Sequence, residues 1–204
     1  MSPTEEQYAF FHELGAAIAQ WALVESALQN VLVRCSKGNG GDAASMAIGF
    51  RTIENFRSKL AYVDAIVTAR CFFEEAMLDR WAKLSAQISA AASKRNELVH
   101  RQAVLDPRGG VGKRIVLVEG GWYLKPRIDT GQETPNKINI RDLAQRGFQF
   151  RDLCISLDNF GHALSGEPEP FPEPPAQQPR PPTIRSIEDR MRAGAGRQPR
   201  PSRK

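Results

Sequence analysis

The stretch Arg95-Asn96-Glu97-Leu98-Val99-His100 places charged and polar side chains on the apolar side of a long predicted helix. It lies near the end of a helical pattern that begins around residue 72 and continues to about residue 103. At about 100° per residue, one side of this helix gathers an apolar stripe of Trp81, Leu84, Ile88, Ala91, Ala92 and Val99. Arg95 falls inside the stripe, and Asn96 and His100 lie together on its flank because they are four residues apart. A cation in this seam costs stability when it is buried alone, so it requires a reason beyond packing.

Other segments show the same helical spacing of apolar residues, at about 5–36, 53–70 and 140–165. Asn139 is the expected cap of the last one, and Asp42 is the expected cap of a short helical piece that follows a Gly-rich run. Between the third and last helices, the runs 114–118 and 122–127 flank Glu119-Gly120-Gly121 and predict a β-hairpin. The predicted fold class is all-α: an up-and-down four-helix bundle with a small β-hairpin at about 114–127 inserted before the last helix.

The composition divides the chain into a helical domain, 1–165, and a tail, 166–204. Ten of the fourteen prolines lie in the tail, and between Ala176 and Lys204 it carries a net charge of +6, while residues 1–175 sum to −1. This Pro/Arg-rich segment is expected to be disordered, because it has too little apolar surface to form a core. Two roles remain open for it: a tether that holds RNA through its phosphates, or a solubilising terminus.

Composition also bounds the class of protein. Three widely spaced cysteines predict neither a disulfide framework nor a metal-binding CxxC pattern, so we expect a reducing, cytoplasmic location and no metal or cofactor. No uninterrupted apolar run reaches the length of a membrane span, and the acidic N-terminal residues are untypical of a secretion signal. The Gly-rich run before Arg114 lacks the Ser or Thr of a phosphate-binding loop and precedes a strand.

A second charge lies on an apolar face. Glu25 falls one turn after Trp21 in the first helix. If the first and third long helices are neighbours, Glu25 and Arg95 would form an ion pair that offsets much of the desolvation of both groups. We therefore predict a Glu25–Arg95 pair; the alternative is that Glu25 lies at a dimer or solvent boundary.

The segment Arg95 to His100 resembles the RxxxxH motif of HEPN-domain proteins, with Asn96 directly after the arginine. The resemblance covers roughly residues 5–165 and includes the position of the motif towards the end of the third long helix. It implies a homodimer that cleaves RNA without a metal, with both copies of the motif facing one cleft. It also implies a role as a toxin or in defence against phage, with an antitoxin or other protein as a partner. Members that have lost activity serve as binding modules.

The resemblance gives each motif residue a role. His100 would exchange protons with an RNA 2′-hydroxyl or with the leaving 5′-oxygen, which leaves 2′,3′-cyclic phosphate ends. Arg95 would stabilise charge on the scissile phosphate, and Asn96 would orient His100 or the backbone of the adjacent turn. Basic residues that border an apolar face would contact the RNA, namely Arg51, Arg57 and Lys59.

A purely structural interpretation stands beside the functional one. The stem of Arg95 can pack in the seam while its charged end reaches water, and His100 can simply favour the negative end of the helix dipole. Arg51, Arg57 and Lys59 can likewise be solvated surface charges. The fold would then serve an interaction module with no catalytic site.

Overall fold

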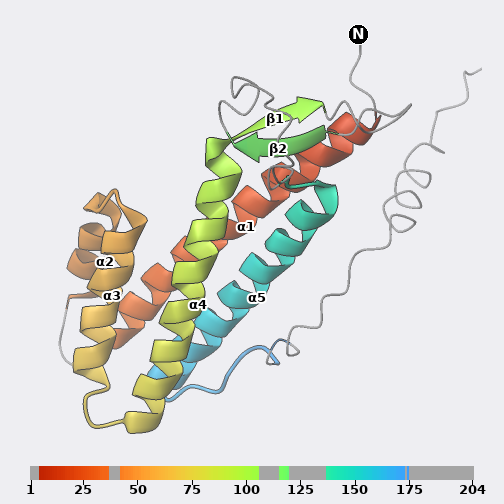
Figure 1. The fold of residues 1–204 in the computed structure, drawn as a ribbon. Helices are drawn as coiled ribbons and strands as arrows, with labels where there is room; N and C mark the ends of the chain where they lie inside the picture. The colour runs from red at the N-terminus through yellow and green to blue at the C-terminus, as the bar shows by residue number, and fades with distance from the viewer. Residues whose placement is uncertain (1–4, 37–41, 106–114, 120–136, 173, 175–204) are drawn as a thin grey trace, which may run out of the picture.

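The computed structural model describes residues 5–36, 42–105, 115–119, 137–172 and 174, and these residues are mostly helical, as predicted. Two long helices side by side form the centre of the fold (Figure 1): α1 (Glu5–Ser36) and α5 (Ile140–Leu164). Gly147 of α5 lies 3.7 Å from Ala17, while Arg34 near the end of α1 contacts His162 near the end of α5. The two helices therefore run in the same direction.

The short helix α2 (Ala43–Thr52) explains this parallel arrangement. It reverses the chain, so that α3 (Phe56–Arg70) again runs alongside α1, with Phe56 against Trp21 and Lys59 against Glu25. The helix α4 (Glu75–His100) runs back along α3 and α5. A regular up-and-down bundle of four helices would make the first and last antiparallel. Here α2 adds one more reversal, so the predicted alternation of the four long helices is wrong.

Most helix starts follow the expected capping chemistry. The Asp42 side chain accepts a hydrogen bond from Ala44 N, and Asn139 forms a capping box with Asp142. The predicted 53–70 helix begins later, at Phe56, where Asn55 supplies the cap. Residues 71–74 form the turn between α3 and α4.

The third long helix does not reach residue 103, because the backbone changes to extended conformation at Arg101. Strand β1 (Arg101–Leu105) follows α4 directly and pairs antiparallel with β2 (Ile115–Glu119). The predicted 114–118 strand is thus confirmed almost residue for residue, but its described partner is β1. The predicted partner, 122–127, lies outside the described residues. The antiparallel pairing with β2 identifies 101–105 as a strand, which the helical pattern of the preceding residues obscured.

The core is built around two tryptophans that are each tied to a carboxylate. Trp21 packs edge-on against Phe56 and Phe150, at ring-centroid distances of 4.8 and 5.3 Å, and its Nε1 donates to Glu25. Trp81 packs against Phe160, and its Nε1 donates to Asp64 at 2.8 Å. Each buried indole N–H thereby keeps a partner, which avoids the cost of an unsatisfied donor.

The segment after α5 corrects the predicted boundary at residue 166. Residues 167–172, which we call the strap, fold back over the end of the bundle instead of leaving it. The buried side chain of Asn159 binds both backbone groups of Phe171, donating to its oxygen at 3.0 Å and accepting from its nitrogen at 3.2 Å. Glu169 pairs with Arg80 at 2.6 Å, and Glu167 pairs with Arg34 at 2.7 Å. Polar contacts, rather than apolar burial, thus hold this proline-rich segment in place. Its low apolar content predicted disorder because composition does not reveal such contacts.

Among the described helices, α1 is the one whose length and composition would suffice to cross a membrane. A core helix meets the same two criteria, and the inner side of α1, which includes Trp21, Val24 and Leu28, is buried against other helices. Its apolar character is therefore explained in part by its central place in the fold.

Candidate functional site

Arg95 lies in the buried seam of α4, as the sequence predicts. The buried residues of this helix have the spacing of an inward-facing stripe: Trp81, Leu84, Ile88, Ala91 and Leu98. Arg95 occupies the position in this stripe between Ala91 and Leu98. Leu98 completes the stripe instead of Val99, whose side chain is 39% exposed. Arg95 itself is half-buried. Its Nη1 donates to Asn96 Oδ1 at 3.1 Å, while its Nε is buried and has no hydrogen-bond partner among the described residues.

Asn96 and His100 are both exposed on the same side of the last turns of α4. Asn96 holds the guanidinium of Arg95 and has no described hydrogen bond to His100, so the expected orienting contact goes to the other motif residue. His100 is the last residue of α4, at the junction with β1. Within the described residues, no hydrogen bond or ion pair fixes its imidazole ring.

Glu97, inside the motif, is held by an arginine that the sequence analysis did not single out. Arg146 of α5 donates through Nη2 to Glu97 Oε2 at 2.7 Å and through Nη1 to the Lys94 carbonyl at 2.9 Å. Arg101 Nη2 lies 3.8 Å from the same Glu97 oxygen. The signal was present in the sequence, because Arg146 occupies the position between Leu143 and Phe150 in the apolar spacing of α5, as Arg95 does in α4.

The predicted Glu25–Arg95 pair is wrong. Glu25 Oε2 accepts from Lys59 Nζ at 3.1 Å, and its Oε1 accepts from Trp21 Nε1 at 2.8 Å. Arg95 lies near the level of Arg146 on α5 and therefore of Ala17 on α1. Glu25 is about two turns further along α1, on the order of 10 Å at 1.5 Å per residue. The carboxylate is thus too far along the axis and is already paired.

The three candidate RNA-binding residues gather at α2 and α3. Arg51 is exposed, and its Nε donates to Gln29 at 3.3 Å. Arg57 is exposed near the start of α3. Lys59 is half-buried, with its ammonium on Glu25 and 5.2 Å from the centre of the Phe50 ring. RNA binding by these residues stays a prediction, with Arg51 and Arg57 the more accessible of the three.

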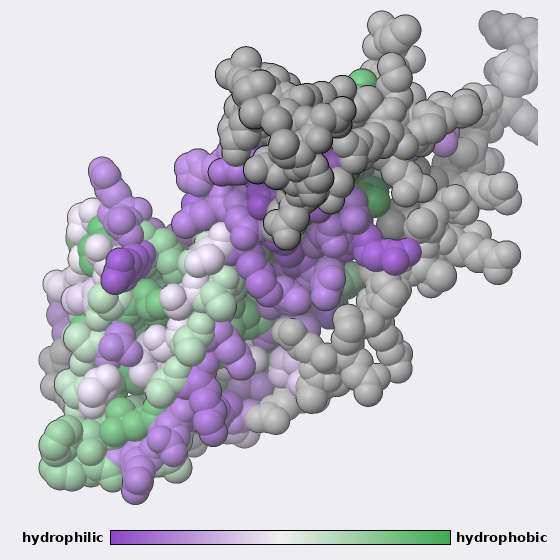
Figure 2. All heavy atoms as spheres, viewed as in Figure 1, coloured by the Kyte–Doolittle hydropathy of each residue, from purple (hydrophilic) through white to green (hydrophobic). Residues whose placement is uncertain are grey.

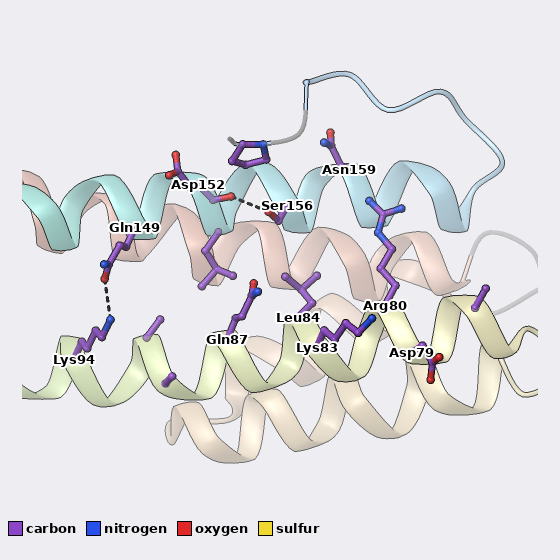
Figure 3. Close-up of a pocket in the computed structure, with 15 residues that line it drawn as sticks. Asp79, Arg80, Lys83, Leu84, Gln87, Lys94, Gln149, Asp152, Ser156 and Asn159 are labelled. Atoms are coloured by element: carbon purple, nitrogen blue, oxygen red, sulfur yellow. Dashed lines mark hydrogen bonds between the residues drawn. The ribbon is translucent and has the colours of Figure 1, made fainter. Parts of the chain in front are cut away.

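A groove of about 720 Å³, lined by both polar and apolar side chains, runs between α4 and α5 (Figure 3). Arg80, Lys83 and Lys94 project from α4, and Gln149, Asp152 and Ser156 come from α5. Lys94 Nζ donates to Gln149 Oε1 at 2.9 Å and closes the wall at that end. Pro174, just beyond the strap, also lines the groove. The groove ends one residue before Arg95, so it leads to the motif without containing it.

Hydrophilic residues gather where the motif lies. In the view of Figure 2 they occupy the region around the C-terminal half of α4, whereas apolar residues dominate the lower left of the molecule. Arg146 and Arg101 lie at the Glu97 carboxylate, Lys94 and Arg95 lie on the adjoining turn of α4, and Glu119 is opposite Arg101 in the strand pair. This end of α4 therefore presents more positive than negative charge, which favours binding of an anion.

A second polar cluster lies where the strap meets α1 and α5. His162 Nε2 lies 2.8 Å from Arg34 Nη2, and its Nδ1 lies 3.0 Å from Glu167 Oε2. Burial raises the pKa of the Asp158 carboxyl, against the opposing attraction of His162 and Arg34. Burial, and next the charge of Asp158, raises the pKa of the Cys154 thiol to about 11. This thiol is therefore a poor nucleophile at neutral pH.

No family model, no curated protein and no solved structure matches this chain.

Proposed function

We propose that this chain is an HEPN-like, metal-independent endoribonuclease that acts as a homodimer, with Arg95 and His100 of both copies forming one site. The observation that supports this most is the buried, unpartnered Nε of Arg95 on the seam of α4. A buried donor without an acceptor costs about 1 to 3 kcal/mol, and the fold tolerates that cost in the same helix end that carries the exposed His100. A phosphate oxygen is the acceptor that a guanidinium fork best fits.

The roles in cleavage follow from this placement. The RNA 2′-oxygen would attack the adjacent phosphorus, and the bond from phosphorus to the 5′-oxygen would break. One His100 would accept the 2′-hydroxyl proton, and the His100 of the second copy would give a proton to the leaving 5′-oxygen. Arg95 would stabilise the added charge on the phosphate, with Asn96 holding its guanidinium through the hydrogen bond at 3.1 Å. Arg146 and Glu97 would fix the last turns of α4 that carry these groups.

The biological setting that fits such an enzyme is a cytoplasmic toxin or phage-defence effector with an antitoxin or another protein as partner. In that setting, Arg51 and Arg57 would extend RNA contact beyond the motif. The groove between α4 and α5, which ends at Lys94, would give a flanking RNA segment a path to the site.

The test is cleavage of RNA by the purified full chain in the presence of a metal chelator. The proposal expects 5′-hydroxyl and 2′,3′-cyclic phosphate ends, and loss of cleavage by at least about a hundredfold in His100→Ala and Arg95→Ala. Val99→Ala is the matched control, because Val99 is exposed beside His100 and outside the motif identities. Cleavage that survives His100→Ala, or no cleavage of any RNA, would overturn the proposal.

A catalytically inert interaction module is the second candidate. The observation that favours it is the His100 ring, which no described residue orients, although general acids and bases are normally positioned by a hydrogen bond. In that case, RNA or a protein partner would bind with similar affinity to the wild type and to His100→Ala. Arg95→Ala would still weaken binding of an anionic partner.

A further inference from the structure

The outward face of α1 is exposed and carries no acidic or basic residue other than a histidine between Tyr8 and Asn30. Its large side chains are Tyr8, Phe11, Ile18 and Leu23, which are 63%, 52%, 38% and 50% exposed. Only 39% of the most apolar window of this helix is buried inside the fold. Six turns of a helix surface without Asp, Glu, Lys or Arg are untypical of a surface that stays in water.

Gly15, in the middle of this face, gives an independent indication of contact. A Cβ added at Gly15 would meet no atom within 4 Å, so nothing in the described chain requires glycine there. Glycine is among the least favourable residues in a helix interior. At Gly161, by contrast, an added Cβ would lie 2.9 Å from Arg34 Cδ, which explains that glycine from within the chain. The missing side chain at Gly15 therefore points to close approach by something outside it.

We propose that the outward face of α1 is the contact surface for a second copy of this chain. When two copies of α1 cross antiparallel about Ile18 and Ala19, Gly15 of one lies opposite Ala22 of the other. Phe11 then lies opposite Ser26 and Leu23. Large side chains at the ends thus meet small or aliphatic ones, so the face is self-complementary under a two-fold axis.

The exposed area is of the right order for such a contact. The four large side chains together expose on the order of 400 Å², about half of the roughly 800 Å² that each partner contributes to a standard interface. The small residues between them and the neighbouring turns would supply the remainder.

A membrane surface is the other occupant that an apolar face could take, and the charges disfavour it. Helices that lie on membranes carry Lys and Arg at the edges of the apolar face. Here the first turn of α1 holds Glu5 and Glu6, and the exposed residues from Tyr8 to Asn30 include no Lys or Arg. Anionic headgroups would repel this end of the helix.

This contact goes beyond the proposed ribonuclease activity. α4 packs against the inner side of α1, so the outward face points away from the helix that carries Arg95 and His100. A contact between two copies of α1 does not bring the Arg95–His100 motifs of the two copies together. The inference therefore stands or falls without any measurement of RNA cleavage.

The experiment measures the solution mass of the full chain by sedimentation equilibrium over a wide range of concentration. The wild type should have at least twice the 22.7 kDa of one chain. Gly15→Leu and Ala19→Glu should each halve that mass, while Ala82→Glu, the same change at an exposed site on α4, should leave it unchanged. Gly15→Leu adds a side chain that meets nothing inside the fold, so its circular dichroism should stay that of the wild type.

Two outcomes would overturn the inference. One is a wild-type mass of a single chain at every concentration; binding of that single chain to phosphatidylcholine vesicles, abolished by Ala19→Glu, would then assign the face to a membrane. The other is a mass that neither Gly15→Leu nor Ala19→Glu reduces.

Discussion

Arg146 of α5 holds Glu97 of α4 through an Nη2–Oε2 contact of 2.7 Å, one residue away from the exposed Asn96. The same guanidinium also donates to the Lys94 carbonyl, a backbone group in the C-terminal part of α4. One arginine thereby fixes the helix end that carries the candidate site to the neighbouring helix.

Arg146→Ala should lower the free energy of unfolding by about 1 to 2 kcal/mol, because it removes two charge-assisted hydrogen bonds, with a discount for the partial exposure of Glu97. Urea unfolding measures the change, and amide exchange should quicken at the end of α4. Arg151→Ala is the control, since Arg151 is exposed and its loss should cost under about 0.5 kcal/mol. An equal loss in the free energy of unfolding for the two substitutions would show that the Arg146–Glu97 contact stabilises the fold no more than an exposed ion pair does.

Asn159→Ala should release the strap, because Asn159 supplies both hydrogen bonds to the Phe171 backbone. The two lost bonds predict a destabilisation of about 2 kcal/mol and faster amide exchange at Phe171. Proteolysis between Glu167 and Pro172 should also become faster. Gln145→Ala, at an exposed position of the same helix, should change none of these. Unchanged exchange at Phe171 would mean that the ion pairs of Glu167 and Glu169 hold the strap without Asn159.

Asp158→Asn should stabilise the protein at neutral pH. Burial raises the pKa of Asp158 above 3.8 in the folded state, so that state binds the proton more tightly than the unfolded chain does. Stability from this group is then fully present below pH 3.8 and is lost as the pH rises through the raised pKa. The variant avoids that loss, and its advantage should vanish below pH 3.8. An Asp158→Asn protein less stable than the wild type at neutral pH would show that attraction to His162 and Arg34 outweighs burial.

Cys154 should react slowly with iodoacetamide in the folded protein at neutral pH. Its pKa is raised to about 11, first by burial and then by Asp158, so very little thiolate is present. The rate, followed by mass spectrometry, should increase about tenfold per pH unit up to that value. Asp158→Asn should make Cys154 react faster, because it removes the negative charge beside the thiol. A rate that levels off near about pH 8.5, as for an exposed cysteine, would contradict the prediction.

The sequence predicted the elements better than their pairing. Helix starts at Asp42 and Asn139 depend on local capping, which neighbouring residues specify by themselves. The Glu25–Arg95 pair depended on how far two helices are offset along the bundle, and that offset is set by the reversal at α2. The partner of β2 was missed because the helical spacing was extended to about residue 103, whereas the backbone becomes extended at Arg101.

The part of the candidate site that could be predicted is the set of arginines that interrupt the apolar spacing of a helix. Arg95 lies in the seam as the spacing requires, and the same test applied to α5 would have found Arg146. The strap could not be found in this way. Its place depends on one buried amide, Asn159, and on glutamates whose arginine partners are distant in the sequence.

The parallel course of α1 and α5 has a mechanical consequence. Because α1 starts at the end of the bundle where α5 also starts, a force that stretches the chain between Glu5 and Leu164 slides the two helices along each other. Sliding breaks many side-chain contacts at once, whereas antiparallel terminal helices would peel apart one contact at a time. The protein should therefore resist unfolding by a tether at its two ends more strongly than its modest size suggests.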